Sequence, residues 1–183
     1  GVGTISSIVD ANIISLGEYN QIQQYLEDAV DAQIYPDLYL AARLIVILSF
    51  RCGLRRNEVF KLTLDDFQDN AAPQLLIRPN DHRLVKTKSS VRRFPLDMFL
   101  NEKELKLLRA WKKKRIENNK DEGNEHFFFA IPELLYELIP ERRIFNIIRD
   151  AMHAVTGDAT LRFHHLRHSF GSWLLLAVSL ASI

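Results

Sequence analysis

Two side chains near the end of the sequence, His164 and Arg167, have the types and the spacing that phosphate binding requires. In a helix, residues at positions i and i+3 lie on one face, one turn apart. Arginine offers a planar fork that matches two phosphate oxygens, and histidine adds a donor that can also transfer a proton. Taken alone, such a pair is more often a solvated surface pair or a buried structural histidine.

A second basic element, Gly53-Leu54-Arg55-Arg56-Asn57-Glu58, lies far upstream. Arg55 follows a predicted helix break and begins a short helix, where N-terminal amides also favour anions. Glu58, one turn later, can hold the guanidinium of Arg55 or Arg56 in place. The plainer interpretation is a helix end followed by a surface salt bridge.

A third basic element surrounds Lys86, on a segment whose alternation predicts a strand of a hairpin. A flexible ammonium there can reach a leaving oxygen. Lys88 lies on the same face of that strand and is the alternative candidate. An ordinary exposed lysine fits the local sequence equally well.

Together these side chains describe a phosphoryl-transfer site that stabilises charge with protein cations instead of a metal ion. Arg55 and Arg167 would hold the nonbridging oxygens as the phosphorus becomes five-coordinate. Lys86 would protonate a departing sugar oxygen, and His164 would hydrogen-bond the phosphate or assist proton transfer. No carboxylate pair and no set of metal ligands accompanies them.

The composition is that of a soluble globular chain with an uneven charge distribution. Of 183 residues, 47% are apolar and 26% charged, which allows one domain or slightly more. Residues 1–42 contain six of the 23 acidic side chains and no Lys or Arg, so the remaining 141 residues carry 24 basic against 17 acidic side chains. A basic body with an acidic first segment fits a polyanionic partner engaged on one face.

Cysteine usage and hydrophobicity exclude several classes of protein. The single cysteine, Cys52, rules out an internal disulfide and argues against a Cys-based metal site. The apolar run Trp173–Val178 is far too short to span a membrane, and no signal peptide is visible. We therefore expect a cytoplasmic protein without a membrane partner.

Capping residues and changes of period predict the elements that position these side chains. A capping box at Ser15 and Glu18 opens a helix whose apolar stripe includes Tyr25 and Val30. A second helix, apolar nearly all round and therefore buried, runs from Pro36 to Gly53. A short helix follows, from about Arg55 to Leu62.

An alternation of side chains with a period of two residues then predicts three antiparallel strands, Gln74–Arg78, Arg83–Lys88 and Val91–Leu96. A long helix capped by Asn101 ends in the charge run Lys112–Arg115, which we interpret as a solvated face. Another helix begins at Pro140 and ends at Gly157, and the last helix carries the His-x-x-Arg pair. The expected fold is α+β, mainly helical with a small three-stranded antiparallel sheet, in one domain spanning residues 15–183 after a linker at 1–14.

Three of these elements resemble the catalytic domain of the tyrosine recombinase (phage integrase) family. They are the Gly-Leu-Arg-x-x-Glu element, the lysine of a hairpin that ends in Phe94-Pro95-Leu96, and the run His164-His165-Leu166-Arg167-His168-Ser169-Phe170. Their order and distances also match, over roughly residues 15–178. The resemblance implies the tyrosine recombinase fold and site-specific breakage and rejoining of double-stranded DNA through a 3′-phosphotyrosyl intermediate. It implies no metal or nucleotide cofactor, no small-molecule substrate, and self-association on DNA.

The resemblance also assigns roles to individual residues. Arg55 takes the first catalytic arginine, Glu58 its supporting acid and Lys86 the hairpin lysine, while His164 and Arg167 take the His-x-x-Arg pair. The catalytic residues are thus expected to be Arg55, Lys86, His164 and Arg167.

Three further residues receive roles outside the chemistry. His168 matches a position that is usually structural in the family. Lys88 and Arg92, basic residues of the predicted hairpin, are the expected contacts to DNA.

The sequence departs from the family pattern at both ends. In the family a further His or Trp and then the nucleophilic Tyr follow the second arginine by about twenty and thirty residues, whereas this sequence ends sixteen residues after Arg167. All five tyrosines precede His164, and only about fifteen residues precede the first helix, where such enzymes carry a separate DNA-clamping domain. We therefore expect a fragment, incomplete at its C-terminus and inactive alone.

Two other functions stay open at this point. A DNA-binding module could keep the recombinase fold and lack catalysis. A metal-dependent hydrolase could use His164 and His168 at i and i+4, but neither a glutamate nor a third ligand stands at a familiar spacing.

Overall fold

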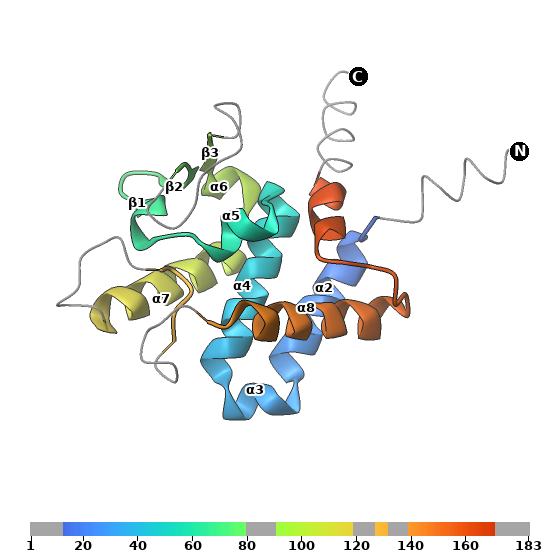
Figure 1. Ribbon diagram of the computed structural model, residues 1–183. Helices are drawn as coiled ribbons and strands as arrows, with labels where there is room; N and C mark the ends of the chain where they lie inside the picture. Colours follow the sequence, from blue (N-terminus) through green and yellow to red (C-terminus); the bar gives the residue numbers. More distant parts are fainter. Residues whose placement is uncertain (1–12, 80–90, 119–126, 132–138, 171–183) are drawn as a thin grey trace, which may run out of the picture. The chain divides into compact units, whose positions relative to one another are not determined.

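The computed structural model describes residues 13–79, 91–118, 127–131 and 139–170, which Figure 1 traces in colour. They divide into two compact units. The first unit combines residues from the two ends of the chain, up to Arg55 and from Ile144 onward, and the second comprises Arg56–Arg143. The prediction of one domain over residues 15–183 stays a prediction.

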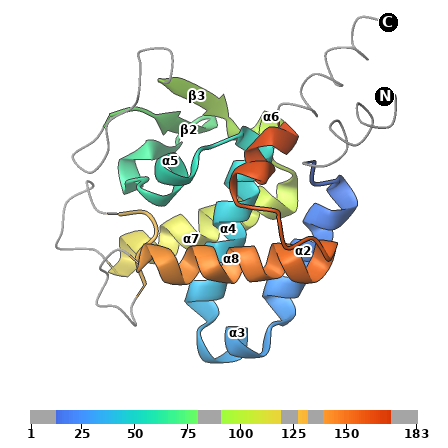
Figure 2. The same ribbon diagram turned by 45° about the vertical axis from the view of Figure 1, so that its right-hand side comes forward.

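Helix α4 (Pro36–Cys52) is the buried centre of the first unit, as its nearly uniform hydrophobicity predicted. Twelve of its seventeen side chains are buried, Cys52 among them. Helices α2 (Leu16–Asp28) and α3 (Val30–Ile34) pack against it, and Figures 1 and 2 both show α2 and α4 side by side, joined by α3. None of the helices in the described part of the chain, α4 included, is long and apolar enough to span a membrane.

The first helix begins as predicted but ends at Asp28, before Val30, which the predicted apolar stripe included. Ser15 Oγ accepts a hydrogen bond from the Glu18 amide, and the Glu18 carboxylate accepts one from the Ser15 amide, which completes the capping box. The backbone leaves the helical region at Ala29, where ψ is 138°. This break turns the following residues away from the core, so Val30 is 78% exposed, and Tyr25 is 45% exposed. The predicted placement of these two side chains on the inner stripe is therefore wrong.

Helix α8 (Glu141–Thr156) precedes the last described helix, which belongs to the first unit. The helical period predicts Ile144, Ile147, Ile148 and Met152 on its inner face, and all but the half-buried Ile147 are buried. Gly157, with φ of 70°, ends it. The helix of residues 164–170 follows.

The second unit contains the predicted small antiparallel sheet, with partly different strands. Strand β2 (Pro73–Ile77) pairs with β1 (Phe67–Asp69) on one side and β3 (Arg92–Pro95) on the other. β2 and β3 match two predicted strands, whereas β1 was not predicted because three residues are too few to show a period. The predicted strand at 83–88 lies outside the described residues.

Short helices and α7 complete the second unit. These are α5 (Arg56–Phe60), the 3₁₀ helix η1 (Leu64–Asp66) and α6 (Leu96–Phe99), followed by α7 (Glu102–Asn118). Asn101 and Glu104 cap α7 reciprocally, at 2.8 and 2.9 Å. Leu105, Leu108 and Trp111 are buried at helical spacing, and the Trp111 indole donates to the Phe128 carbonyl at 2.8 Å.

The charge run that follows Trp111 on α7 is only half solvated. The Lys112 ammonium donates to the Phe67 carbonyl and lies 5.0 Å from the centre of the Phe67 ring. Arg115 is 3% exposed and donates to the Phe127 carbonyl at 2.9 and 3.3 Å. The two lysines between them are exposed. The prediction of a solvated run is therefore wrong for Lys112 and Arg115, because a spacing of three places both near the buried face of the helix.

Gly53, at the C-terminal end of α4, packs against the helix of residues 164–170 within the first unit. Its φ of 68° is in the left-handed region that ends helices. The Phe170 ring packs so closely that a Cβ at position 53 would lie 2.3 Å from its Cδ1. Position 53 therefore needs glycine for conformation and for space.

We predict that Gly53→Ala lowers the free energy of unfolding by about 2–5 kcal/mol, because left-handed backbone costs about 1–2 kcal/mol and overpacking adds about 1–3 kcal/mol. Gly157→Ala is the matched control, since it has φ of 70° and nothing within 4 Å of an added Cβ. It should lose about 1–2 kcal/mol. Urea unfolding of both variants measures the difference, and equal losses would contradict the packing argument.

Candidate active site

In the first unit, a hydrogen bond holds Arg167 at a residue close in sequence to Arg55, the other arginine predicted to bind phosphate. Arg167 Nε donates a hydrogen bond to the Gly53 carbonyl at 2.8 Å, across 114 positions of sequence. Arg55 is exposed and stands two residues after Gly53, while Arg167 is half-buried. The helix of residues 164–170 thus delivers its arginine to the end of α4, beside the start of the Arg55 element.

A buried serine and a histidine hold this helix in place. Ser169 Oγ accepts a hydrogen bond from the Ile14 amide at 2.8 Å and donates to the His165 carbonyl at 2.8 Å. At the other end, the Arg162 amide donates to His165 Nδ1 at 2.8 Å, in the manner of a helix cap. Because His165 and Ser169 both anchor this segment, the helix presents His164 and Arg167 from a fixed backbone.

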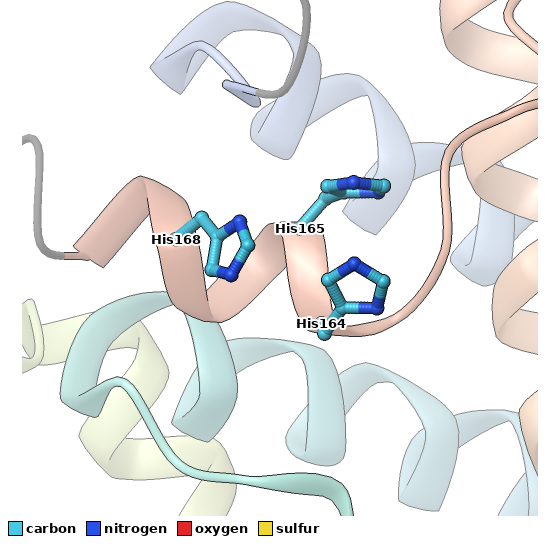
Figure 3. Close-up of side chains that lie close together, drawn as sticks. All are labelled: His164, His165 and His168. Carbon is cyan, nitrogen blue, oxygen red and sulfur yellow. The ribbon is translucent and has the colours of Figure 1, made fainter.

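Three histidines cluster on this helix, as Figure 3 shows. His164 and His168 are exposed and His165 is buried. The ring centroid of His164 lies 4.2 Å from that of His165 and 5.2 Å from that of His168. The ring nitrogens that could bind a ligand lie within 4.8 Å of one another. Sequence reasoning had paired His164 with His168 by helical spacing but had not included His165.

Two of the three histidines, His164 and His165, have pKa values below that of a free imidazole. Desolvation lowers the pKa of His164 below its usual 6.5, and the charges of His168 and Arg162 lower it further. Desolvation also lowers the pKa of His165, with further lowering by His164 and His168 that the Arg162 amide and Asp158 oppose. Both rings are therefore neutral near pH 7. Neutral His165 carries its proton on Nε2, because Nδ1 accepts the amide hydrogen bond.

In the second unit, Glu58 has a partner that the sequence did not indicate. The Arg92 guanidinium donates to the Glu58 carboxylate at 2.6 Å, with the Glu58 side chain 7% exposed and that of Arg92 26% exposed. Arg56, one of the two expected partners, forms an ion pair with Glu141 at 2.9 Å. Helical spacing could suggest only near neighbours, whereas β3 supplies Arg92 from 34 positions away.

The structure describes five of the seven predicted site residues. Arg55, His164 and Arg167 lie in the first unit, and Glu58 and Arg92 lie in the second. The catalytic roles of Arg55, His164 and Arg167, the role of Glu58 as a supporting acid and the contact of Arg92 with DNA all stay predictions. Lys86 and Lys88 lie outside the described residues.

The histidine pKa values predict that acid destabilises the fold. Because His164 and His165 bind protons more weakly in the folded chain, the unfolded chain binds more protons between their folded pKa values and about 6.5. Stability therefore falls as pH decreases through that range. Chemical unfolding at pH 7 and pH 5 should show a smaller loss for His164→Gln than for the parent chain, and an equal loss would contradict the assignment.

Three comparisons place the chain among known proteins. The model of the phage integrase family matches residues 15–180. A search of curated protein sequences gives no match. Among solved structures, the chain is similar to the XerH site-specific recombinase in a pre-cleavage complex with its difH substrate, with a TM-score of 0.62 and 15% identity over 91% of this chain and 43% of that one.

A second similar structure is that of XerA recombinase, with a TM-score of 0.59 and 18% identity over 89% of this chain and 48% of that one. The chain thus spans less than half the length of either recombinase. At these identities the likeness shows the fold, and it confirms the predicted tyrosine recombinase architecture. Because the family model covers nearly all of the sequence, the chain belongs to the phage integrase family.

Proposed function

We propose that this chain supplies the phosphate-binding residues of a site-specific recombinase, which breaks and rejoins double-stranded DNA through a 3′-phosphotyrosyl intermediate. The observation that carries the proposal is the hydrogen bond from Arg167 to the Gly53 carbonyl, which brings Arg167 and His164 to the Arg55 element. Membership of the phage integrase family supports it. So does the likeness to XerH, which was solved with its difH substrate.

In this mechanism the two arginines stabilise the charge that develops on phosphorus. Arg55 and Arg167 bind the nonbridging oxygens of the scissile phosphate, and their attraction grows as the phosphorus becomes five-coordinate. The Gly53 carbonyl orients the Arg167 guanidinium through Nε before DNA binds. Such preorganisation is effective because no group has to be reoriented during the reaction.

Proton transfer accompanies the exchange of bonds at phosphorus. A tyrosine hydroxyl loses its proton as its oxygen bonds to phosphorus, and the bond from phosphorus to the 5′-oxygen breaks. Neutral His164 hydrogen-bonds the phosphate or accepts a proton, and Lys86 protonates the departing 5′-oxygen. The nucleophile follows Arg167 in the family pattern and lies outside the sequence given. The mechanism uses protein cations for charge stabilisation and requires no cofactor.

The same proposal defines the partners. The chain acts on double-stranded DNA in the cytoplasm, as the recombinase of a mobile genetic element, and associates with further copies there. Glu58 supports the first arginine, while Lys88 and Arg92 contact the DNA backbone. Residues 15–183 form the catalytic domain, which is inactive without the segment that carries the tyrosine.

The direct test is a covalent adduct. We expect the longest natural version of the chain, mixed with nicked, labelled DNA from its own locus, to form a protein–DNA adduct that resists denaturation. Arg55→Ala and Arg167→Ala should each reduce adduct formation at least about 100-fold, the order expected for losing one transition-state donor. Arg149→Ala is the control, because Arg149 is an exposed α8 residue paired with Asp150.

Normal adduct formation by a folded Arg167→Ala variant would contradict the assignment. Absence of an adduct on any locus DNA, with DNA binding retained, would instead indicate a binding module that has the fold without the reaction.

Phosphate contacts also predict how the 183-residue chain responds to salt. Its affinity for duplex DNA should fall steeply with salt concentration, because each neutralised phosphate releases a counterion. Arg55→Ala should reduce the slope of log K against log salt by about one, and Arg149→Ala should leave it unchanged. Fluorescence anisotropy over a salt series measures both slopes. Binding that does not depend on salt would contradict a phosphate site.

A further inference from the structure

We propose that His164 and His168 form a binding site for a transition-metal ion such as Zn²⁺, and that the bound ion inhibits the phosphate site. The inhibitory part rests on the proposed function, because it names a ligand that competes for His164. The binding part rests on the histidine cluster alone and is tested separately.

The geometry of the cluster suits an ion held by two imidazoles. His164 and His168 are both exposed and stand one turn apart, with ring centroids separated by 5.2 Å. Figure 3 shows the three rings gathered at the helix of residues 164–170. The candidate ligand nitrogens already lie within 4.8 Å of one another. Around four-coordinate zinc, nitrogens about 2.1 Å from the ion lie about 3.4 Å apart, so rotation of the two exposed side chains completes the site.

His165 belongs to the cluster but is not a metal ligand in this proposal. Its Nδ1 accepts the Arg162 amide, so the neutral ring has its proton on Nε2 and offers that edge as a donor. Binding a metal through His165 would break this hydrogen bond at the helix start. The ion therefore has two protein ligands, with water at its remaining positions.

The chemistry of the cluster selects the class of ion. The cluster consists of imidazoles without a carboxylate, and imidazole nitrogen suits Zn²⁺, Cu²⁺ and Ni²⁺, whereas Mg²⁺ and Ca²⁺ require oxygen ligands. The nearby Arg162 and Arg167 repel any cation, which further disfavours ions that bond weakly to nitrogen.

Metal binding at this pair inhibits catalysis because it uses the same lone pair. In the proposed mechanism His164 hydrogen-bonds the phosphate or accepts a proton. Coordination blocks proton acceptance by the ring nitrogen that binds the ion. The ion therefore acts as a reversible inhibitor, and a chelator such as EDTA restores activity.

Calorimetric titration of the 183-residue chain with ZnCl₂ tests the site without reference to activity. We expect one ion per chain at pH 7.5, at least tenfold weaker binding in His168→Gln, and no binding of Mg²⁺. His153→Gln is the matched control, because the His153 ring is already engaged with the Leu161 carbonyl at 2.8 Å. Circular dichroism verifies that both variants fold. Unchanged affinity in His168→Gln, or an equal loss in His153→Gln, would overturn the site.

Adduct formation by the longer protein tests the inhibition. Zn²⁺ at a concentration that saturates the site should reduce the adduct at least tenfold in the parent protein, with recovery after EDTA. In His168→Gln the fractional inhibition by the same concentration should largely disappear, whatever the basal rate. Undiminished adduct formation with the site filled would overturn the inhibitory role. A parent protein that forms no adduct even without zinc would count against the proposed function, while the titration would still decide the metal site.

Discussion

The hydrogen bond between Arg167 and the Gly53 carbonyl is the interaction on which the candidate site in the first unit depends. Its acceptor is available because α4 ends in a left-handed residue, which directs the chain out of the helix. Glycine also lets the Phe170 ring pack directly on the backbone, where any Cβ would clash. Since α4 is buried along most of its length, the acceptor stands at the end of a well-packed element of this unit.

A second anchor makes the position of the final helix unambiguous. Ser169 links the backbone of Ile14 to that of His165, so the start of the described chain and its last helix are held by one buried hydroxyl. A site that works by placing cations around a phosphate requires this immobility, because misplacement of a charged group by about 1 Å weakens catalysis strongly. The polar side chain that fixes the helix is thus as important as the charged ones that it presents.

The sequence predicted those helix starts and ends that depend only on residues adjacent along the chain. The capping boxes at Ser15 and Asn101 and the left-handed ends at Gly53 and Gly157 were readable because each uses residues within one turn. The motif residues of the first unit were likewise proposed from type and order, and their roles stay predictions. Their joining contact was not predicted, because nothing in a separation of 114 positions specifies which atom of Arg167 is bound or by what.

Features set by tertiary packing were missed for the same reason. Glu58 pairs with Arg92 because β3 supplies it, and Arg115 is buried because Phe127 offers a carbonyl to it. Both charged residues looked solvated or locally paired, since sequence periodicity does not show where long side chains find distant partners.

The two proposals for the histidine cluster involve the same ring, that of His164. Desolvation and, to a lesser extent, the charges of His168 and Arg162 lower the pKa of His164, and a neutral imidazole accepts either a proton or a metal ion. A DNA phosphate beside Arg167 would bring negative charge to the same place and raise the pKa of His164 again. In the proposed site, substrate binding would favour the protonated ring, which cannot coordinate a metal. If both proposals hold, DNA and a transition-metal ion would therefore oppose each other by thermodynamic linkage, because protonation and coordination use one lone pair.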